Sequence, residues 1–163
     1  MDIRQVGFTE GLQVGYHWYK AQDIDPLFEF GHGLSYTEFD FSKVSVTPQF
    51  TSGDEEIRVQ CRPTNTGERV GSEVAQVYVE LPAVAGEPSQ RLIGWEHVTL
   101  QPGEHRNVEI ALSSEDLADL LLLLLLLQYW HESTESWTTA PGTYTVHVGG
   151  SVDTEQEATF RIK

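Results

Sequence analysis

The sequence has little cysteine and little positive charge. Its 163 residues include one cysteine, Cys61, so no internal disulfide can form and the fold has to rest on apolar burial and hydrogen bonds. Ten lysines and arginines stand against 25 aspartates and glutamates, which gives a formal net charge of -15. A surface of this sign repels phosphate backbones and anionic lipid, which argues against nucleic acid and membrane as partners.

Several sequence signals of function are also missing. The N-terminus shows no charged start followed by an apolar core, and no Asn-x-Ser/Thr sequon occurs, which favours a cytoplasmic protein. No P-loop, G-x-S-x-G or G-x-G-x-x-G motif is present. The histidines share no metal-ligand spacing, so we expect neither a metal nor a cofactor; they are His17, His32, His97, His105, His131 and His147.

From Asp40 onward, short runs of alternating polar and apolar residues are broken by turn signals, which is typical of an antiparallel β-sandwich. Cys61 alternates with apolar neighbours, which predicts a buried, unreactive thiol. Tyr144 follows a Pro141-Gly142 corner, where sandwiches often tie the corner to the backbone through a tyrosine hydroxyl. We predict an all-β, immunoglobulin-like fold of about seven strands, which include 41–46, 57–61, 74–81, 92–100, 108–112, 144–149 and 158–162.

The residues before this domain have a different character. Aromatic residues crowd around glycines without helical or strand periodicity, so residues 1–38 are interpreted as an extended arm that packs on another domain. The stretch from Asp25 to Phe39 surrounds the turn at Gly31-His32-Gly33 with large rings, which indicates a hinge. We expect His32 to fix this turn by donating to a backbone carbonyl. The expected interdomain contacts are Tyr16, Trp18, Tyr19, Phe28, Phe30, His32 and Tyr36.

Eight consecutive leucines, Leu120 to Leu127, do not fit the sandwich pattern. A helix of this length reaches about 12 Å, well short of the ~30 Å of a bilayer core, so no membrane span is predicted. Because Ser113 to Asp116 can cap a helix, the first interpretation is one short helix docked on the sandwich or on a neighbouring domain. The alternatives are an error in the sequence and a self-association contact through Leu120 to Leu127.

Carboxylates are so abundant that a pair of them is weak support for a glycosidase, which needs two across a cleft. Adjacent carboxylates such as Glu55-Glu56 lie in turns or at strand edges, where a solvated surface is the better interpretation. The indoles of Trp95, Trp130 and Trp137 could stack on sugar rings if exposed, although such residues more often fill a core or an interdomain seam. Trp95 and Trp137 are the candidate sugar contacts.

Two sets of motifs resemble a known family. Glu10-Gly11-Leu12-x-Val14-Gly15-Tyr16-x-Trp18-Tyr19, followed by 26–39, resembles the end of the second domain and the linker of family-three glycoside hydrolases, the β-glucosidase and β-xylosidase group. Leu92-x-Gly94-Trp95-x-x-Val98 and Pro141-Gly142-x-Tyr144-x-Val146-x-Val148-Gly149 look like the C-terminal fibronectin type III-like domain of that family. The similarity runs from about Val6 onward and departs at the leucine run.

The resemblance implies a noncatalytic module. In that family the nucleophilic Asp lies on an N-terminal (β/α)8 barrel and the acid/base carboxylate usually on the following α/β domain, and no residue here matches either one. We therefore expect a fragment, a separately expressed piece or one component of a split enzyme. Residues 1–38 would belong against the absent α/β domain, and 39–163 would form the fibronectin type III-like sandwich. The implied partners are the barrel and α/β domains of a hydrolase of terminal β-linked sugars, which the module would stabilise and whose substrate cleft it would help to shape.

Two other interpretations stay open. A carbohydrate- or protein-binding module would act on its own through Trp95 or Trp137 and would be ordered throughout, whereas an interdomain arm would be disordered or prone to aggregate in isolation. A small enzyme in its own right would need two carboxylates that converge in a pocket and have perturbed pKa values.

Overall fold

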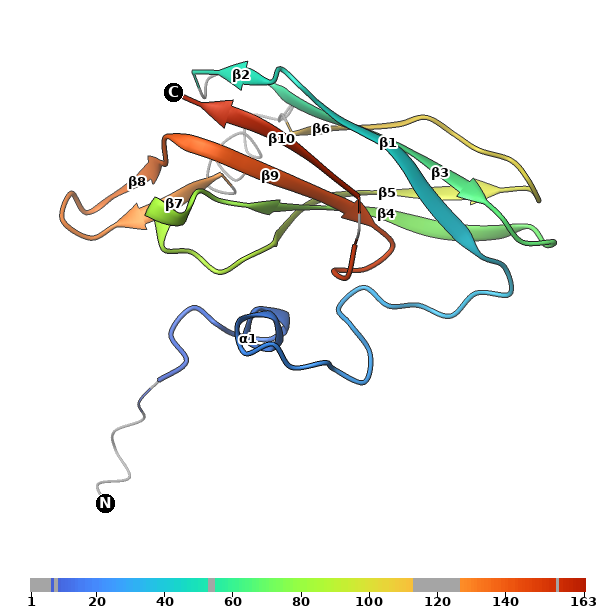
Figure 1. Cartoon of the computed structure of the whole chain (residues 1–163), viewed down its shortest axis with the longest axis horizontal. Coiled ribbons are helices and arrows are strands. Elements are labelled where there is room, and N and C mark those ends of the chain that lie inside the picture. Colours follow the sequence, from blue (N-terminus) through green and yellow to red (C-terminus); the bar gives the residue numbers. More distant parts are fainter. Residues whose placement is uncertain (1–6, 8, 53–54, 113–126, 155) are drawn as a thin grey trace.

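The computed structural model describes residues 7, 9–52, 55–112, 127–154 and 156–163. They form a β-sandwich with the N-terminal arm beneath it (Figure 1). The elements are α1 (Tyr16–Ala21), β1 (Phe39–Thr47), β2 (Phe50–Thr51), β3 (Ile57–Asn65), β4 (Gly71–Glu80), the 3₁₀ turn η1 (Ala83–Ala85), β5 (Arg91–Leu100), β6 (Val108–Leu112), β7 (Gln128–His131), β8 (Ser136–Thr139), β9 (Gly142–Gly149) and β10 (Gln156–Ile162).

Two sheets make up the sandwich. One has the strand order β1-β3-β6 and the other the order β2-β10-β9-β4-β5. Neighbouring strands pair antiparallel except β10 and the short β2, which pair in parallel. Within the described residues, seven sandwich strands have five or more residues, which confirms the predicted all-β fold and its strand number. The helix predicted at the leucine run, and the self-association contact there, lie outside the described residues apart from Leu127, which is buried.

The hydrophobic core lies between the two sheets and follows the strand period of two. In β3 the alternation buries Ile57, Val59 and Cys61, with Cys61 only 3% exposed, as its spacing predicted. Across the core, β9 and β10 contribute the second wall: Tyr144, Val146, Val148, Phe160 and Ile162. The apolar residues that alternate along the sequence are therefore the residues that form the core. No helix among the described residues is long and apolar enough to cross a membrane.

Tyr144 ties the corner before β9 to the backbone. Its hydroxyl donates to the carbonyl oxygen of Ala140 at 2.9 Å, and its ring stacks on Phe160 with the centroids 5.0 Å apart. Burial raises the pKa of Tyr144 to about 12, so the hydroxyl keeps its proton and remains a donor at neutral pH. This is the corner contact that the Pro141-Gly142 motif predicted.

Replacing Tyr144 with Phe should lower the free energy of unfolding by about 1–3 kcal/mol, because the buried corner carbonyl loses a partner. The measurement is urea denaturation followed by circular dichroism. Tyr36→Phe removes the same hydroxyl from a side chain that is 92% exposed and should leave the unfolding midpoint unchanged. Equal midpoints for both variants would contradict this account of the corner.

Cys61 should be nearly inert in the native chain. Burial raises the pKa of its thiol to about 11, so little thiolate forms at pH 8. A disulfide reagent should then react about 100-fold more slowly than in denaturant, where the pKa is about 8.5. The thiol pKa is higher in the folded chain than in the unfolded chain. The stabilising contribution of the buried, protonated thiol is therefore complete below about pH 8.5 and is lost as the pH rises towards 11. A native rate equal to the denatured rate would show that the site is open.

Candidate interdomain interface

The outer face of the five-stranded sheet is covered by the arm. Strand β4 is buried at five consecutive residues, Ala75 to Val79, although side chains alternate between the two faces of a strand. Val77 and Val79 belong to the core between the sheets. Gln76 and Tyr78 therefore face outward, and the arm contacts both of them.

Tyr16 is the main aromatic anchor of the arm. Its ring stacks on Phe30 with the centroids 4.7 Å apart and meets the ring of Tyr78 edge-on at 6.2 Å. Its hydroxyl accepts a hydrogen bond from the backbone N–H of Leu92 on β5 at 3.3 Å. Burial raises the pKa of Tyr16 and that of Tyr78, so both phenols are neutral at physiological pH and the contact carries no charge.

Gln76 joins the sheet to two segments that are distant in the sequence. Its Nε2 donates to the carbonyl oxygen of Gly31 in the arm at 3.3 Å and to that of Gly150 after β9. Its Oε1 accepts from the hydroxyl of Tyr78 at 2.5 Å. A buried amide deprived of such partners costs about 1–3 kcal/mol. Gln76 therefore fixes where the arm crosses the sheet.

Two more contacts hold the arm at its sides. The backbone N–H of Val152, in the loop after β9, donates to the carbonyl oxygen of Phe30 at 2.9 Å. The Nδ1 of His17 lies 3.0 Å from the carbonyl oxygen of Ser89, just before β5. The arm is thus hydrogen-bonded to the segments next to β9 and β5, the two strands that flank β4, and it packs with the sandwich as one unit.

The sequence predicted an extended arm, but the arm is not extended throughout. Residues Tyr16–Ala21 form a six-residue helix, α1. Gly15 precedes it with φ near 63°, and no side chain caps its first N–H groups. A helix this short is not stable by itself, so the contacts of Tyr16 and His17 with the sandwich account for it.

Among the described residues no backbone carbonyl accepts a hydrogen bond from the His32 ring, so the structure contradicts the predicted role of that ring. Its Nδ1 lies 3.4 Å from the carboxylate of Glu29, three residues earlier, and its ring lies 5.2 Å from that of Phe28. The turn is closed instead by the backbone, because the N–H of His32 donates to the carbonyl oxygen of Glu29 at 3.0 Å. The His32 ring therefore does not close the turn at Gly31-His32-Gly33, contrary to the prediction from the sequence.

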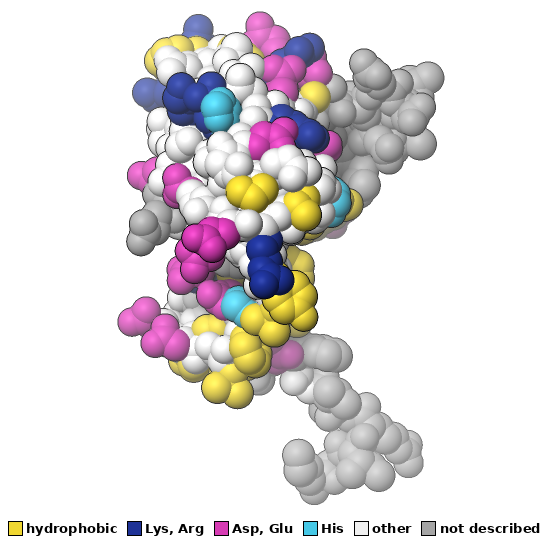
Figure 2. Space-filling view, turned by 90° about the vertical axis from the view of Figure 1, so that its right-hand side faces the viewer, with side chains coloured by type: hydrophobic (Ala, Val, Ile, Leu, Met, Phe, Trp, Pro, Cys, Tyr) yellow, Lys and Arg dark blue, Asp and Glu magenta, His cyan; other side chains and the backbone are white. Residues whose placement is uncertain are grey.

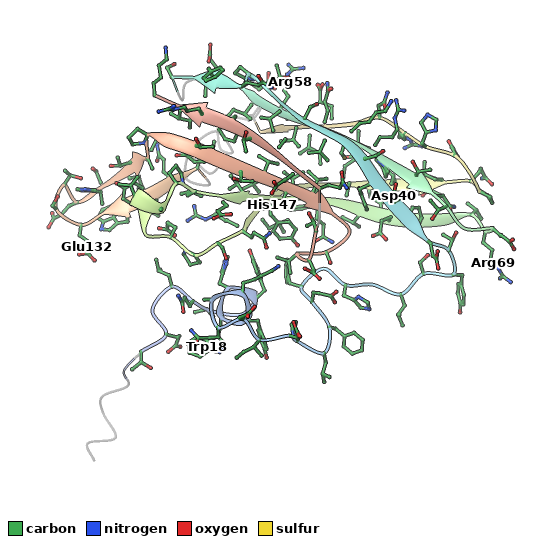
Figure 3. The ribbon with its side chains drawn as sticks, in the orientation of Figure 1. Trp18, Asp40, Arg58, Arg69, Glu132 and His147 are labelled. Carbon is green, nitrogen blue, oxygen red and sulfur yellow. The ribbon has the colours of Figure 1, made fainter. Side chains whose placement is uncertain are left out.

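The side of the arm that faces away from the sheets is apolar and exposed. Phe28 and Tyr36 are 71% and 92% exposed, and Leu27 and Leu34 are almost entirely so. Trp18 lies on the side of α1 that points away from the sandwich (Figure 3). Hydrophobic side chains gather on this part of the molecule beside acidic ones (Figure 2). We call these exposed residues the arm patch: Leu12, Val14, Trp18, Tyr19, Ile24, Leu27, Phe28, Leu34 and Tyr36.

A cavity of about 670 Å³ lies between the arm and the loop after β9. Its polar lining includes Lys20, whose Nζ lies 3.5 Å from a carboxylate oxygen of Asp153. Its apolar lining consists mostly of arm residues: Tyr16, Tyr19, Ile24, Leu27, Phe28 and Phe30. The hollow is therefore part of the same apolar surface as the arm patch.

The described residues offer no metal site, since none of their His, Cys, Asp and Glu side chains form a group of three suited to a cation. A glycosidic general acid requires a raised carboxyl pKa. Glu109 on β6 shows the opposite, because hydrogen bonds from Gln60 and Arg58 lower its pKa on a solvent-exposed face. That cluster is a surface ion-pair network.

A model of the fibronectin type III-like domain matches residues 73–152. Over 165 aligned residues the chain is 37% identical to the probable beta-glucosidase I of Aspergillus fumigatus, an alignment that covers 98% of this chain and 18% of that protein. It is 34% identical to the thermostable beta-glucosidase B of Acetivibrio thermocellus over 90% of this chain and 18% of that protein. The chain thus spans about a fifth of the length of these relatives.

Solved structures agree. The beta-glucosidase DesR of Streptomyces venezuelae superposes with a TM-score of 0.78 at 34% identity, over 96% of this chain and 19% of that one. The beta-D-glucoside glucohydrolase of Trichoderma reesei gives 0.82 at 25% identity, over 100% of this chain and 24% of that one. This chain matches the C-terminal part of family-three β-glucosidases. Because the alignments include the arm, the arm belongs to the matched region together with the fibronectin type III-like domain.

The two candidate sugar contacts lie on different sheets of the fibronectin type III-like domain. Trp95 is 66% exposed on β5 and is paired with Gln76, so it lies on the face that the arm crosses. Trp137 is 50% exposed on β8, where it is paired with Trp130. The structure therefore does not bring them together in one site, and their contact with sugar stays a prediction. The hairpin that carries Trp137 was missed in the sequence because its two strands have only four residues each.

Gly31→Ala should detach the arm locally from the fibronectin type III-like domain. Gly31 has φ near 86°, and a Cβ added there would meet the amide of Gln76. The substitution should cost about 1–3 kcal/mol and should speed hydrogen exchange at the backbone N–H of Val152, which bonds to Phe30.

Gly33→Ala is the matched control, because Gly33 has no atom within 4 Å of an added Cβ and no left-handed φ. Its exchange rates and unfolding midpoint should stay at those of the unmodified chain. If Gly31→Ala behaved in the same way, the Gln76 contact would not be what fixes the arm.

Proposed function

We propose that this chain acts as the noncatalytic C-terminal module of a β-glucosidase-type glycoside hydrolase. In this proposal the arm patch docks on the α/β domain of that enzyme and holds the fibronectin type III-like domain against it. The observation that carries the proposal is the two-sided arm, fixed to β4 by Gln76 and Tyr16 yet exposing rings such as Tyr36 on its other side.

Energetics support docking through this patch. Fully burying one large apolar side chain contributes about 1.5–3 kcal/mol. Leu27, Leu34 and Tyr36 are each more than 90% exposed, so nearly all of that contribution is still available to a partner. Monomers seldom leave apolar patches of this kind rimmed by charge unless they bind something. Asp23, Asp25 and Glu29 supply charge next to this patch, since they line the adjoining cavity.

The chemistry of the whole enzyme is assigned to the partner domains. Relatives named beta-glucosidase extend well beyond the matched region, and the lowered pKa of Glu109 is the opposite of what a glycosidic general acid requires. In this proposal the parent enzyme hydrolyses terminal β-linked glucosides. The module stabilises the domain that helps to form the cleft.

The test is a chimera in which this chain replaces the matching C-terminal part of the Aspergillus fumigatus relative. The chimera should hydrolyse a nitrophenyl β-glucoside, and the chain alone should not. Phe28→Ser with Tyr36→Ser should lower the thermal midpoint and the activity of the chimera, since truncating central interface residues costs about 2 kcal/mol or more each. Turnover by the chain alone, freed of host glycosidases, would contradict the noncatalytic assignment.

Phe50→Ser with Val84→Ser is the matched control. Both side chains are about as exposed as Phe28, at 68% and 66%, but neither lies on the arm. The control chimera should keep its thermal midpoint and its activity. In the isolated chain, all four substitutions should change the free energy of unfolding by less than about 0.5 kcal/mol, because they are on the surface. Equal losses in both chimeras would show that the arm patch is not the docking surface.

A further inference from the structure

The β7–β8 hairpin carries an exposed pair of tryptophans that arm docking does not use. Trp130 and Trp137 are directly opposite each other in the hairpin register, with ring centroids 5.8 Å apart and planes inclined at 75°. They are 48% and 50% exposed. The hairpin projects from one end of the sandwich, with Glu132 at its tip (Figures 1 and 3). Two indoles held in this way on a projecting ribbon form an aromatic surface open to solvent.

The two faces of the hairpin differ in what they contact. Cross-strand partners share a face, so Gln128 and Thr139 lie on the tryptophan face, one step along from the indoles. On the opposite face, Tyr129 and His131 contact each other edge-on, with their ring centroids 5.9 Å apart. The tryptophan face thus places two indoles beside one amide and one hydroxyl, and neither of these polar side chains has a hydrogen-bond partner among the described residues.

This set of groups suits a neutral pyranose. At an angle of 75° the two rings form an apolar wall and floor, and the C–H face of a sugar ring can lie on such a surface, while its hydroxyls need the polar groups alongside. β-Linked glucose fits best, because its hydroxyls are equatorial and both of its ring faces present C–H groups. The net charge of -15 disfavours an anionic polymer at the same place.

We propose that the Trp130–Trp137 face of the hairpin is a binding site for neutral β-linked glucan chains, separate from the arm patch. Trp130 and Trp137 stack on the sugar rings, and Gln128 and Thr139 bond to hydroxyls. The choice of β-linked glucose rests in part on the proposed function. The site itself does not, because it involves no residue of the arm patch.

The experiment is native gel electrophoresis of the full chain through gels that contain a soluble mixed-linkage β-glucan. The unmodified chain should be retarded. Trp130→Ala and Trp137→Ala should each weaken binding about tenfold, and Trp137→Phe should restore most of it by keeping a stacking ring. Phe50→Ala is the matched control, since Phe50 is a more exposed ring (68%) that lies on β2, away from the hairpin, and this variant should be retarded like the unmodified chain.

Gln128→Ala provides a test that keeps both indoles in place, in case an alanine at a tryptophan position prevents folding. It should weaken binding a few-fold, and circular dichroism should show an intact fold. An unretarded native chain, or an equal loss in Phe50→Ala, would overturn the proposal. So would tryptophan variants that change the oligomeric state without changing retardation, since the pair would then be a contact between copies. These outcomes do not depend on the chimera, so a failure of arm docking would leave the gel result intact.

Discussion

The structure depends on the burial of β4 from both sides. Its inward residues meet the three-stranded sheet, as in any sandwich, but its outward residues are Tyr78, whose large ring gains from being covered, and Gln76, whose amide can be covered only by polar groups. Gln76 needs polar partners and Tyr78 needs an aromatic environment. The arm supplies both, through the carbonyl of Gly31 and the ring of Tyr16. The arm and the sandwich therefore stabilise each other.

This mutual dependence explains why the match to β-glucosidases does not stop at the domain boundary. The fibronectin type III-like model covers residues 73–152, whereas the relatives align over 98% of the chain in the case of the Aspergillus fumigatus protein. A segment that only linked two domains would be free to vary in length and composition. An arm whose backbone bonds to a buried glutamine and to the loop after β9 has far less freedom.

The strands were predictable because their apolar residues recur every second position, as Ile57, Val59 and Cys61 do in β3. The corner at Tyr144 was predictable for a similar reason, since a turn motif and one side chain sufficed. Helix α1 was not, because it is six residues long, lacks a side-chain cap and is held by tertiary contacts that no local pattern encodes.

The candidate site shows the same division between local and distant information. Its residue types were foreseen, because so many rings outside a strand pattern need a surface to lie on. Which ring turns inward was not foreseen: Tyr16 is partly buried while Tyr36 is 92% exposed. Gln76 was missed altogether, since a glutamine within an apolar strand gives no sign that its partners lie 45 and 74 residues away. The role of His32 was predicted wrongly, because the sequence shows a histidine between two glycines but does not show whether a backbone carbonyl lies within reach of its ring.

The outer face of the three-stranded sheet differs in charge from the arm patch. On the outer face of the three-stranded sheet, Arg58 bridges Glu56 and Glu109 at 2.7 and 2.9 Å, so that face satisfies its own charges in solvent. Exposed pairs of this kind contribute little to stability, but they make a poor surface for docking, because a partner would have to desolvate them. The arm patch has the opposite character, with Leu27, Leu34 and Tyr36 exposed. The two outer faces of the molecule therefore differ: the Arg58 face is suited to water, and the arm patch is suited to apolar contact.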